Sequence, residues 1–172
     1  GYYARWQMVA PAYLAWADAR EADGWSFAFG EEDFEKVLAW DGGQVALKGR
    51  IDRIDRHVDG GYAVLDYKTT TVTSLKARFK NMEDHQLPFY GLLSGFPVES
   101  AHYVALEITA DKNGVKTGDA AAPDYPRWQQ AVQQHIEANV RAIQGGTPLP
   151  ANGISSVCQY CEVRGICRKG AW

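Results

Sequence analysis

The chain has 172 residues, of which 46% are hydrophobic and 12% aromatic, and its formal net charge is −3 at pH 7. This apolar content excludes a disordered chain and favours one domain with a sizeable core. The acidic balance provides no overall attraction for nucleic acid. No apolar run approaches membrane-spanning length and no secretory leader is present, so we expect a cytoplasmic protein.

The first twenty residues predict a helix. Apolar and aromatic side chains recur at helical spacing from Tyr2 to Trp16, and an alanine-rich stretch continues the helix to about Glu21. Pro11 interrupts this pattern, which predicts either a kink or the first turn of a second helix. Because the chain begins with glycine and enters a helix almost at once, we expect a C-terminal fragment of a longer protein.

Three strands are predicted next, as a meander at about 25–38, 44–57 and 61–68. Glycine pairs at 42–43 and 60–61 separate the last two strands from what precedes them, and glycine adopts the positive φ that tight turns require. The acidic run 31–33 favours a solvated turn.

Charged residues gather on the second and third strands. Asp52 lies on the second, while Asp66 and Lys68 end the third and share a face because side chains alternate along a strand. If the hairpin brings the two acids together, their like charges are costly unless a cation or a shared proton compensates them. Carboxylate oxygens suit Mg²⁺, and a neighbouring lysine can orient or deprotonate an attacking water.

These charges also fit a second interpretation, in which the run 50–55 forms surface ion pairs of little energetic consequence. The order of features favours the metal site. Gly-x-Ile-Asp is followed by a hairpin, then by an apolar run ending in Asp-Tyr-Lys-Thr, and then by Gln-x-x-x-Tyr. We therefore interpret the stretch as a metal-dependent nuclease site.

The segment 69–80 predicts a loop with a short helical piece. Its three cations, Lys76, Arg78 and Lys80, fit either a basic strip for a nucleic acid or a solvated loop. A helix follows, with Asn81 or Asp84 as its possible cap. Gln86 and Tyr90 lie four residues apart in this helix and share one face.

The remaining elements complete the predicted fold. A strand is expected at 102–108, an exposed loop at 111–124, and a helix from Pro126 to the glycines at 145–146. Together these elements predict an α/β fold, in which helices flank a central mixed sheet of four or five strands.

From about Trp25 to Arg168 the chain resembles the RecB/AddB-type branch of the PD-(D/E)xK nuclease superfamily. The resemblance implies a restriction-endonuclease-like core in which Asp52 and Asp66 bind Mg²⁺ or Mn²⁺, completed by the backbone carbonyl of Tyr67. It implies that Lys68 is catalytic and that Gln86 and Tyr90 lie beside the DNA strand. Relatives often carry a glutamate near position 31, so Glu31 is a candidate supporting acid.

All three cysteines fall in the tail at 153–172, as Cys158, Cys161 and Cys167. Three thiolates suit a soft metal or an iron–sulfur cluster, and an odd number argues against a disulfide framework. Their spacing resembles the C-terminal triplet of AddB-type nucleases, which implies a [4Fe-4S] cluster completed by an upstream cysteine. This sequence has no fourth cysteine, so free thiols are the alternative for the fragment.

The resemblance implies a DNA exonuclease that works with a helicase domain or subunit in recombinational repair, as one nuclease domain over 1–172. An upstream helical His or Glu expected in relatives has no match, so weak or absent activity of the fragment is a second expectation. Two alternatives of other classes remain. One is an inactive DNA-binding or subunit-docking module of the same fold, and the other is a zinc-binding interaction domain built on the cysteines.

Overall fold

The computed structural model describes residues 2–81, 84–108 and 115–148, and in the tail 151, 153, 155–164, 166, 167 and 169. The chain divides into two compact units, Gly1–Ile136 and Glu137–Trp172. Along the chain, the elements are α1 (Tyr2–Ala22), β1 (Trp25–Trp40), β2 (Gly43–His57), β3 (Tyr62–Lys68), α2 (Val72–Arg78), the 3₁₀ turn η1 (Phe79–Asn81), α3 (Gln86–Ser94), β4 (Val98–Ile108), β5 (Val115–Ala121), α4 (Tyr125–Gln144) and α5 (Ser155–Cys158). None of the described helices is both long and apolar enough to cross a membrane.

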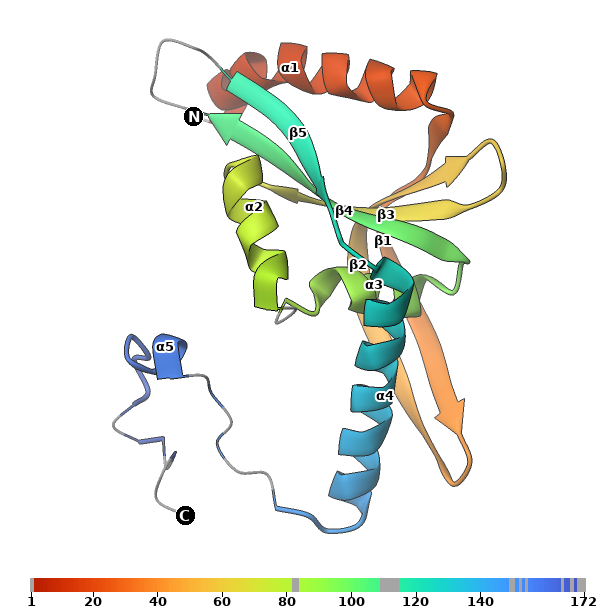
Figure 1. Cartoon of the computed structure of the whole chain (residues 1–172), viewed down its shortest axis with the longest axis vertical. Helices are drawn as coiled ribbons and strands as arrows, with labels where there is room; N and C mark the ends of the chain where they lie inside the picture. The colour runs from red at the N-terminus through yellow and green to blue at the C-terminus, as the bar shows by residue number, and fades with distance from the viewer. Residues whose placement is uncertain are drawn as a thin grey trace. The chain divides into compact units, whose positions relative to one another are not determined.

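The first unit is built on a five-stranded sheet in the order β1-β2-β3-β4-β5 (Figure 1). Strands β3 and β4 are parallel, and every other neighbouring pair is antiparallel. The parallel pair requires a crossover, which α2 and α3 supply between the two strands. The predicted α/β fold with a central mixed sheet flanked by helices is confirmed.

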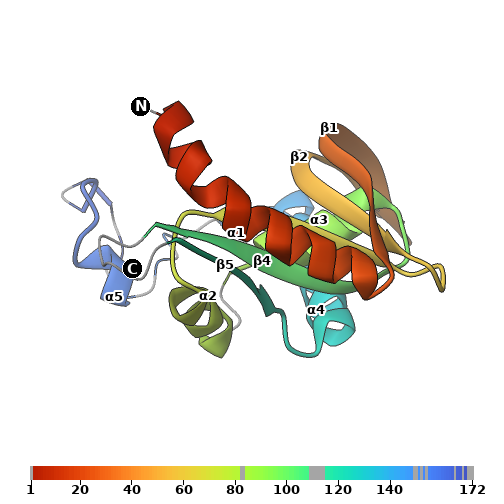
Figure 2. The same ribbon diagram turned by 90° about the horizontal axis from the view of Figure 1, so that it is seen from above.

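Helices cover both faces of this sheet, as Figures 1 and 2 show together. On one face, Trp16 of α1 packs with Trp25 and Tyr67 over a small cluster formed by Ala63, Leu65 and Val104. On the other face lies the main core, which includes residues of α2, α3 and the first turns of α4. Helix α3 buries Leu87, Leu92 and Leu93 in this core, which places it against the sheet beside β2 and β3.

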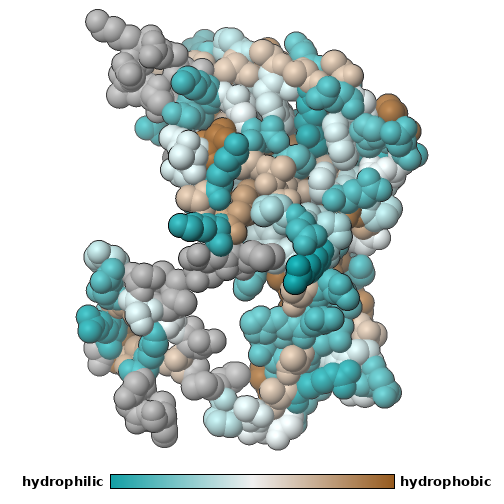
Figure 3. Space-filling model, viewed as in Figure 1, coloured by the Kyte–Doolittle hydropathy of each residue, from teal (hydrophilic) through white to brown (hydrophobic). Residues whose placement is uncertain are grey.

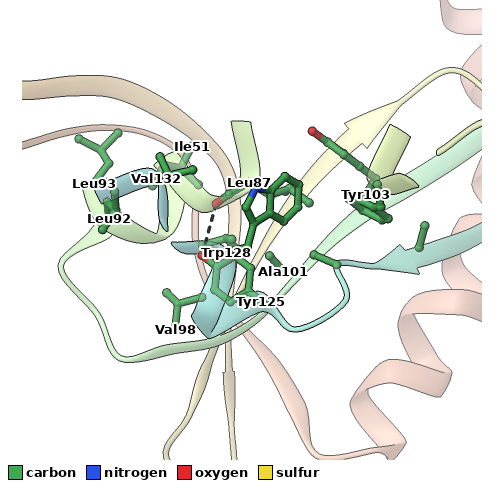
Figure 4. Close-up of a cluster of buried hydrophobic side chains, with 14 of the residues drawn as sticks. Ile51, Leu87, Leu92, Leu93, Val98, Ala101, Tyr103, Tyr125, Trp128 and Val132 are labelled. Carbon is green, nitrogen blue, oxygen red and sulfur yellow. Dashed lines mark hydrogen bonds between the residues drawn. The ribbon is translucent and has the colours of Figure 1, made fainter. Parts of the chain in front are cut away.

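Helix α3 meets the start of α4 within the main core. Tyr125 and Trp128 are each 2% exposed, and the Tyr125 hydroxyl donates a hydrogen bond of 3.3 Å to the Leu87 carbonyl oxygen (Figure 4). Close approach depends on Gly91, since a Cβ there would lie 1.8 Å from the Tyr125 hydroxyl oxygen. Two helices distant in sequence are therefore in direct contact.

Three details of the sequence prediction change. The expected loop at 111–124 is wrong, because Val115–Ala121 forms β5 and pairs with β4 at the sheet edge; positions 111–114 lie outside the described residues. A short, polar edge segment containing glycine has a weak strand pattern, and only its partner strand organises it. Pro11 lies inside one helix rather than starting a second, and the run 31–33, expected as a turn, belongs to β1.

Candidate active site

The two predicted metal-binding carboxylates lie on neighbouring antiparallel strands. The backbone pairing of β2 with β3 ends at Arg53 opposite Leu65, and one residue further along each strand lie Asp52 and Asp66. Beyond this pair, a side chain links the two strands: Asp52 Oδ2 accepts a hydrogen bond of 3.1 Å from the Tyr67 amide. The hairpin thus brings Asp52 to the end of β3 that carries Asp66.

A compact polar cluster surrounds Asp66. Its Oδ2 lies 2.6 Å from Lys68 Nζ, and its Oδ1 accepts a hydrogen bond of 2.6 Å from Gln86 Nε2. Lys68 Nζ also donates to Gln86 Oε1 at 2.9 Å, and Gln86 Nε2 donates to the Tyr90 hydroxyl at 2.9 Å. Gln86 and Tyr90 are one turn apart, so a single face of α3 contributes both. These four predicted residues form one connected group.

Burial governs the electrostatics of this cluster. Asp66 is 1% exposed, and desolvation raises the pKa of its carboxyl above the ordinary value. The Lys68 ammonium lowers that pKa without cancelling the effect, and the charges of Asp52 and Asp84 raise it further. Burial likewise raises the pKa of the Tyr90 hydroxyl, against the hydrogen bond from Gln86. A negative charge on Asp66 is therefore costly even beside Lys68, and a second cation would reduce that cost.

The donor set fits a hard divalent cation. Asp66 Oδ2 is buried and pairs with the Lys68 ammonium at 2.6 Å, and a carboxylate oxygen with one such partner still has a lone pair to offer. Within the described part of the chain, no group of three or more His, Cys, Asp and Glu side chains could hold a metal ion. The ligands that the resemblance implies, Asp52, Asp66 and the Tyr67 carbonyl oxygen, are few enough for Mg²⁺, which keeps several waters.

Asp84 borders the site between α2 and α3. Its Oδ1 accepts a hydrogen bond of 3.3 Å from the Gln86 amide, and its Oδ2 lies 3.5 Å from Arg78 Nη1. The carboxylate thus satisfies a free amide at the start of α3, but the N-cap position is His85, so the prediction of Asn81 or Asp84 as the cap is wrong. Arg78, with Lys76 and Lys80, is exposed on α2 and η1, which leaves the proposed basic strip accessible to solvent.

Glu31 lies within β1 rather than in a turn, in the left-handed region with φ of 54°. Its Oε2 is 3.0 Å from Arg50 Nε, and both side chains are more than half exposed. Its charge contributes to raising the pKa of Tyr90, so it stands near the cluster. The interpretation of the run 50–55 as surface ion pairs thus holds for Arg50.

That interpretation is wrong for the next two charged residues of β2. Arg53 and Asp55 are 7% and 0% exposed, and they bind each other through Arg53 Nε and Asp55 Oδ1 at 2.6 Å. Sequence reasoning missed them, together with their partners Tyr13 and Arg20 in α1. The sequence did contain a signal for this pair, since Arg53 and Asp55 lie among isoleucines in a predicted strand. If such a strand is central in the sheet, its charged side chains are buried and must pair.

The three cysteines line one pocket of about 420 Å³ in the second unit, with Ser155, Gln159, Arg164 and Lys169. All three are free thiols, with Cys158 half-buried and Cys161 and Cys167 exposed. Lys169 Nζ lies 3.5 Å from Cys158 Sγ. The cysteines share a pocket, and their role as cluster ligands stays a prediction.

Comparison with known proteins bears on the site as a whole. A sequence model of the PD-(D/E)XK nuclease superfamily matches residues 1–168. This chain belongs to the PD-(D/E)XK nuclease superfamily. PD-(D/E)XK nucleases generally use Mg²⁺ or Mn²⁺, and the carboxylate oxygens of Asp52 and Asp66 are of the chemical type that such ions prefer.

Among solved structures, one titled "Crystal structure of SSO0001" is similar to this chain, with 18% sequence identity and a TM-score of 0.47. The match covers 91% of this chain and 66% of the other, so the chain spans just under two thirds of that protein's length. A search of curated proteins returned no match to the sequence.

Proposed function

We propose that this chain is the nuclease domain of a metal-dependent deoxyribonuclease, an exonuclease of the RecB/AddB type. The observation that carries the proposal is the joining of Asp66, Lys68 and Gln86 in one hydrogen-bonded cluster, with Asp52 beside it. Superfamily membership supports a nuclease, and the order of the motifs supports the finer assignment.

Each residue has a distinct role in this proposal. Asp52 and Asp66 hold the divalent ion together with the Tyr67 carbonyl oxygen. When bound, that ion lowers the pKa of water and stabilises charge on a phosphate. Lys68 orients the attacking water or the phosphate, and its contacts with Asp66 and Gln86 keep its ammonium at the site. Gln86 and Tyr90 position the DNA strand from α3, and the cations of α2 and η1 attract its backbone.

The wider context follows from the resemblance. We propose that the nuclease works with a helicase domain or subunit in recombinational repair, and that residues 1–172 act as one nuclease domain within it. The tail cysteines Cys158, Cys161 and Cys167 would contribute three ligands to a [4Fe-4S] cluster, with a fourth from elsewhere in the full protein.

The proposal is tested on the complete protein with Mg²⁺ and linear DNA. We expect Asp66→Ala and Lys68→Ala each to lower cleavage by about a hundredfold or more, as loss of one transition-state stabilising group does elsewhere. Lys48→Ala, in an exposed ion pair with Glu35, is the matched control and should cleave normally. Cleavage that survives either site substitution contradicts the assignment.

Two further measurements define the activity. An exonuclease digests linear DNA and leaves closed circular DNA intact, so both substrates are compared under the same conditions. Binding of Mn²⁺ is measured in parallel by calorimetry, with Asp52→Asn as the variant that should remove it. An inactive docking module would cleave neither substrate and would bind no Mn²⁺ through Asp52.

A further inference from the structure

A buried polar network lies behind the site, on the face of the sheet that α1 covers. At its centre, Asp55 accepts hydrogen bonds from two arginines, Arg20 of α1 at 2.5 Å and Arg53 of β2 at 2.6 Å. The Arg53 Nη1 atom then donates to the hydroxyls of Tyr13 and Tyr67, at 2.9 and 3.2 Å. The two hydroxyls also lie 3.0 Å apart, so the network joins α1 to β2 and β3.

Stability alone does not account for this arrangement. Asp55 is fully buried, Arg53 is 7% and Arg20 9% exposed, and moving three charges out of water carries a large desolvation cost. Apolar side chains of similar size often fill such places with equal or greater stability. A buried network with directed bonds does define the relative position of the elements it joins.

Tyr67 connects this network to the site. Its side chain reaches Tyr13 and Arg53 on the α1 side, whereas its backbone amide donates to Asp52 Oδ2 at 3.1 Å. It also lies between Asp66 and Lys68 in the sequence, whose side chains point to the opposite face. Tyr67 thus contacts the network through its side chain and Asp52 through its amide, and its two peptide bonds link it to Asp66 and Lys68.

We propose that α1, acting through Tyr13 and the Arg53–Asp55–Arg20 network, positions the Tyr67 peptide and thereby the carboxylate of Asp52. Tyr13, Arg53 and Arg20 are positioning residues, since none of them touches the site itself. The role in metal binding rests on the proposed function, whereas the control of the Tyr67–Asp52 hydrogen bond does not.

The test uses Tyr13→Phe in the complete chain. This change removes only the hydroxyl and keeps the ring that packs 6.0 Å from the Tyr67 ring. Tyr3→Phe is the matched control, because Tyr3 lies in the same helix and is 74% exposed. The readouts are the amide proton shift of Tyr67, its hydrogen-exchange rate relative to the Leu65 amide, and the Kd for Mn²⁺.

We expect Tyr13→Phe to shift the Tyr67 amide resonance, to accelerate its exchange relative to Leu65, and to weaken Mn²⁺ binding by about three- to tenfold, near the lower end of outer-sphere effects at metal sites. Tyr3→Phe should leave all three at the wild-type values. A Tyr67 amide that is the same in Tyr13→Phe as in wild type overturns the inference.

Comparison with Asp52→Asn separates this inference from the proposed function. If Asp52→Asn abolishes Mn²⁺ binding and Tyr13→Phe leaves the Kd unchanged, the positioning role is wrong. If the Tyr67 amide responds to Tyr13→Phe while Mn²⁺ binding is independent of Asp52, the positioning of Asp52 stands and the nuclease assignment fails.

Discussion

At the scale of single residues, Gln86 is the side chain on which the geometry of the cluster depends. Its amide donates to Asp66 and Tyr90 and accepts from Lys68, so one planar group contacts both the buried acid and the ammonium. A glutamate here would add a fourth negative charge beside Asp52, Asp66 and Asp84, whereas the neutral amide can donate and accept at once.

Substitution of Gln86 tests this arrangement. In Gln86→Leu the ionised Asp66 loses a hydrogen bond of 2.6 Å, which favours its protonated form and raises its pKa further. We expect the pH midpoint of DNA cleavage to rise relative to wild type. The measurement is a pH–rate profile of the complete protein, and Gln44→Leu, at an exposed position in β2, should keep the wild-type midpoint.

Acidification tests Asp66 directly. Because burial raises the folded-state pKa of this carboxyl, the protonated form persists to higher pH than for an ordinary aspartate, near pH 4. Metal binding requires the ionised form, so the affinity for Mn²⁺ should fall as pH decreases through the raised pKa, with a midpoint above 4. Calorimetric titrations at several pH values measure this midpoint, and a value at or below 4 contradicts the burial argument.

The raised pKa of Asp66 affects folding stability in the opposite direction: it favours the folded protein at low pH rather than at high pH. A carboxyl whose pKa is raised by folding stabilises the metal-free protein at low pH, and this contribution is lost as pH rises through the folded-state pKa. Ionisation of Asp66 in the metal-free site is thus costly, and a bound cation would relieve that cost. Such a cost to folding stability is typical of functional sites, where activity and stability make opposing demands.

At the scale of elements, α3 is the part that carries site residues while packing in the core. Leu87 is fully buried, whereas Gln86 and Tyr90 reach the site from the same helix. Its contact with α4 through Gly91 and Tyr125 sets its height above the sheet. Packing at this contact should therefore affect both stability and catalysis.

Gly91→Ala tests that contact. The new Cβ would lie 1.8 Å from the Tyr125 hydroxyl oxygen and 2.6 Å from Gln129 Nε2, so these side chains, or the helix that carries them, must shift. We expect the free energy of unfolding to fall by about 1–3 kcal/mol, as overpacking does in other cores. Urea denaturation measures the change, and the double variant Gly91→Ala/Tyr125→Phe should recover part of it. No recovery would mean that another contact controls the spacing.

At the scale of the whole molecule, the charges are distributed unevenly between surface and interior. The face seen in Figure 3 is mostly hydrophilic, with apolar side chains visible in small separate areas. Inside the first unit, by contrast, Asp55 balances Arg20 and Arg53 between α1 and the sheet. The stability of that unit depends on this pairing once the charges have been buried.

Removal of the central carboxylate tests this dependence. Asp55→Ala leaves Arg20 and Arg53 buried without their counter-charge, and we expect a loss of about 3–5 kcal/mol in the free energy of unfolding. Glu35→Ala breaks an exposed pair with Lys48 and should cost less than about 1 kcal/mol. Denaturant titrations of both variants provide the comparison, and equal losses would contradict the role given to burial.

The sequence by itself determined the order of the main elements and the residues that gather at the site. Strand alternation placed Asp66 and Lys68 on one face, and helical spacing placed Gln86 and Tyr90 together; both periodicities are local properties of the backbone. Their motif order led to the superfamily that the comparison confirmed.

Only the tertiary structure decided which charges are buried and which weak segment becomes a strand. Arg53 and Asp55 have the same local pattern as the exposed Arg50, and they differ because α1 covers them. The segment Val115–Ala121 is ordered as β5 by pairing with β4. Burial and strand pairing depend on contacts between residues far apart in the chain, and a local pattern carries no information about those partners.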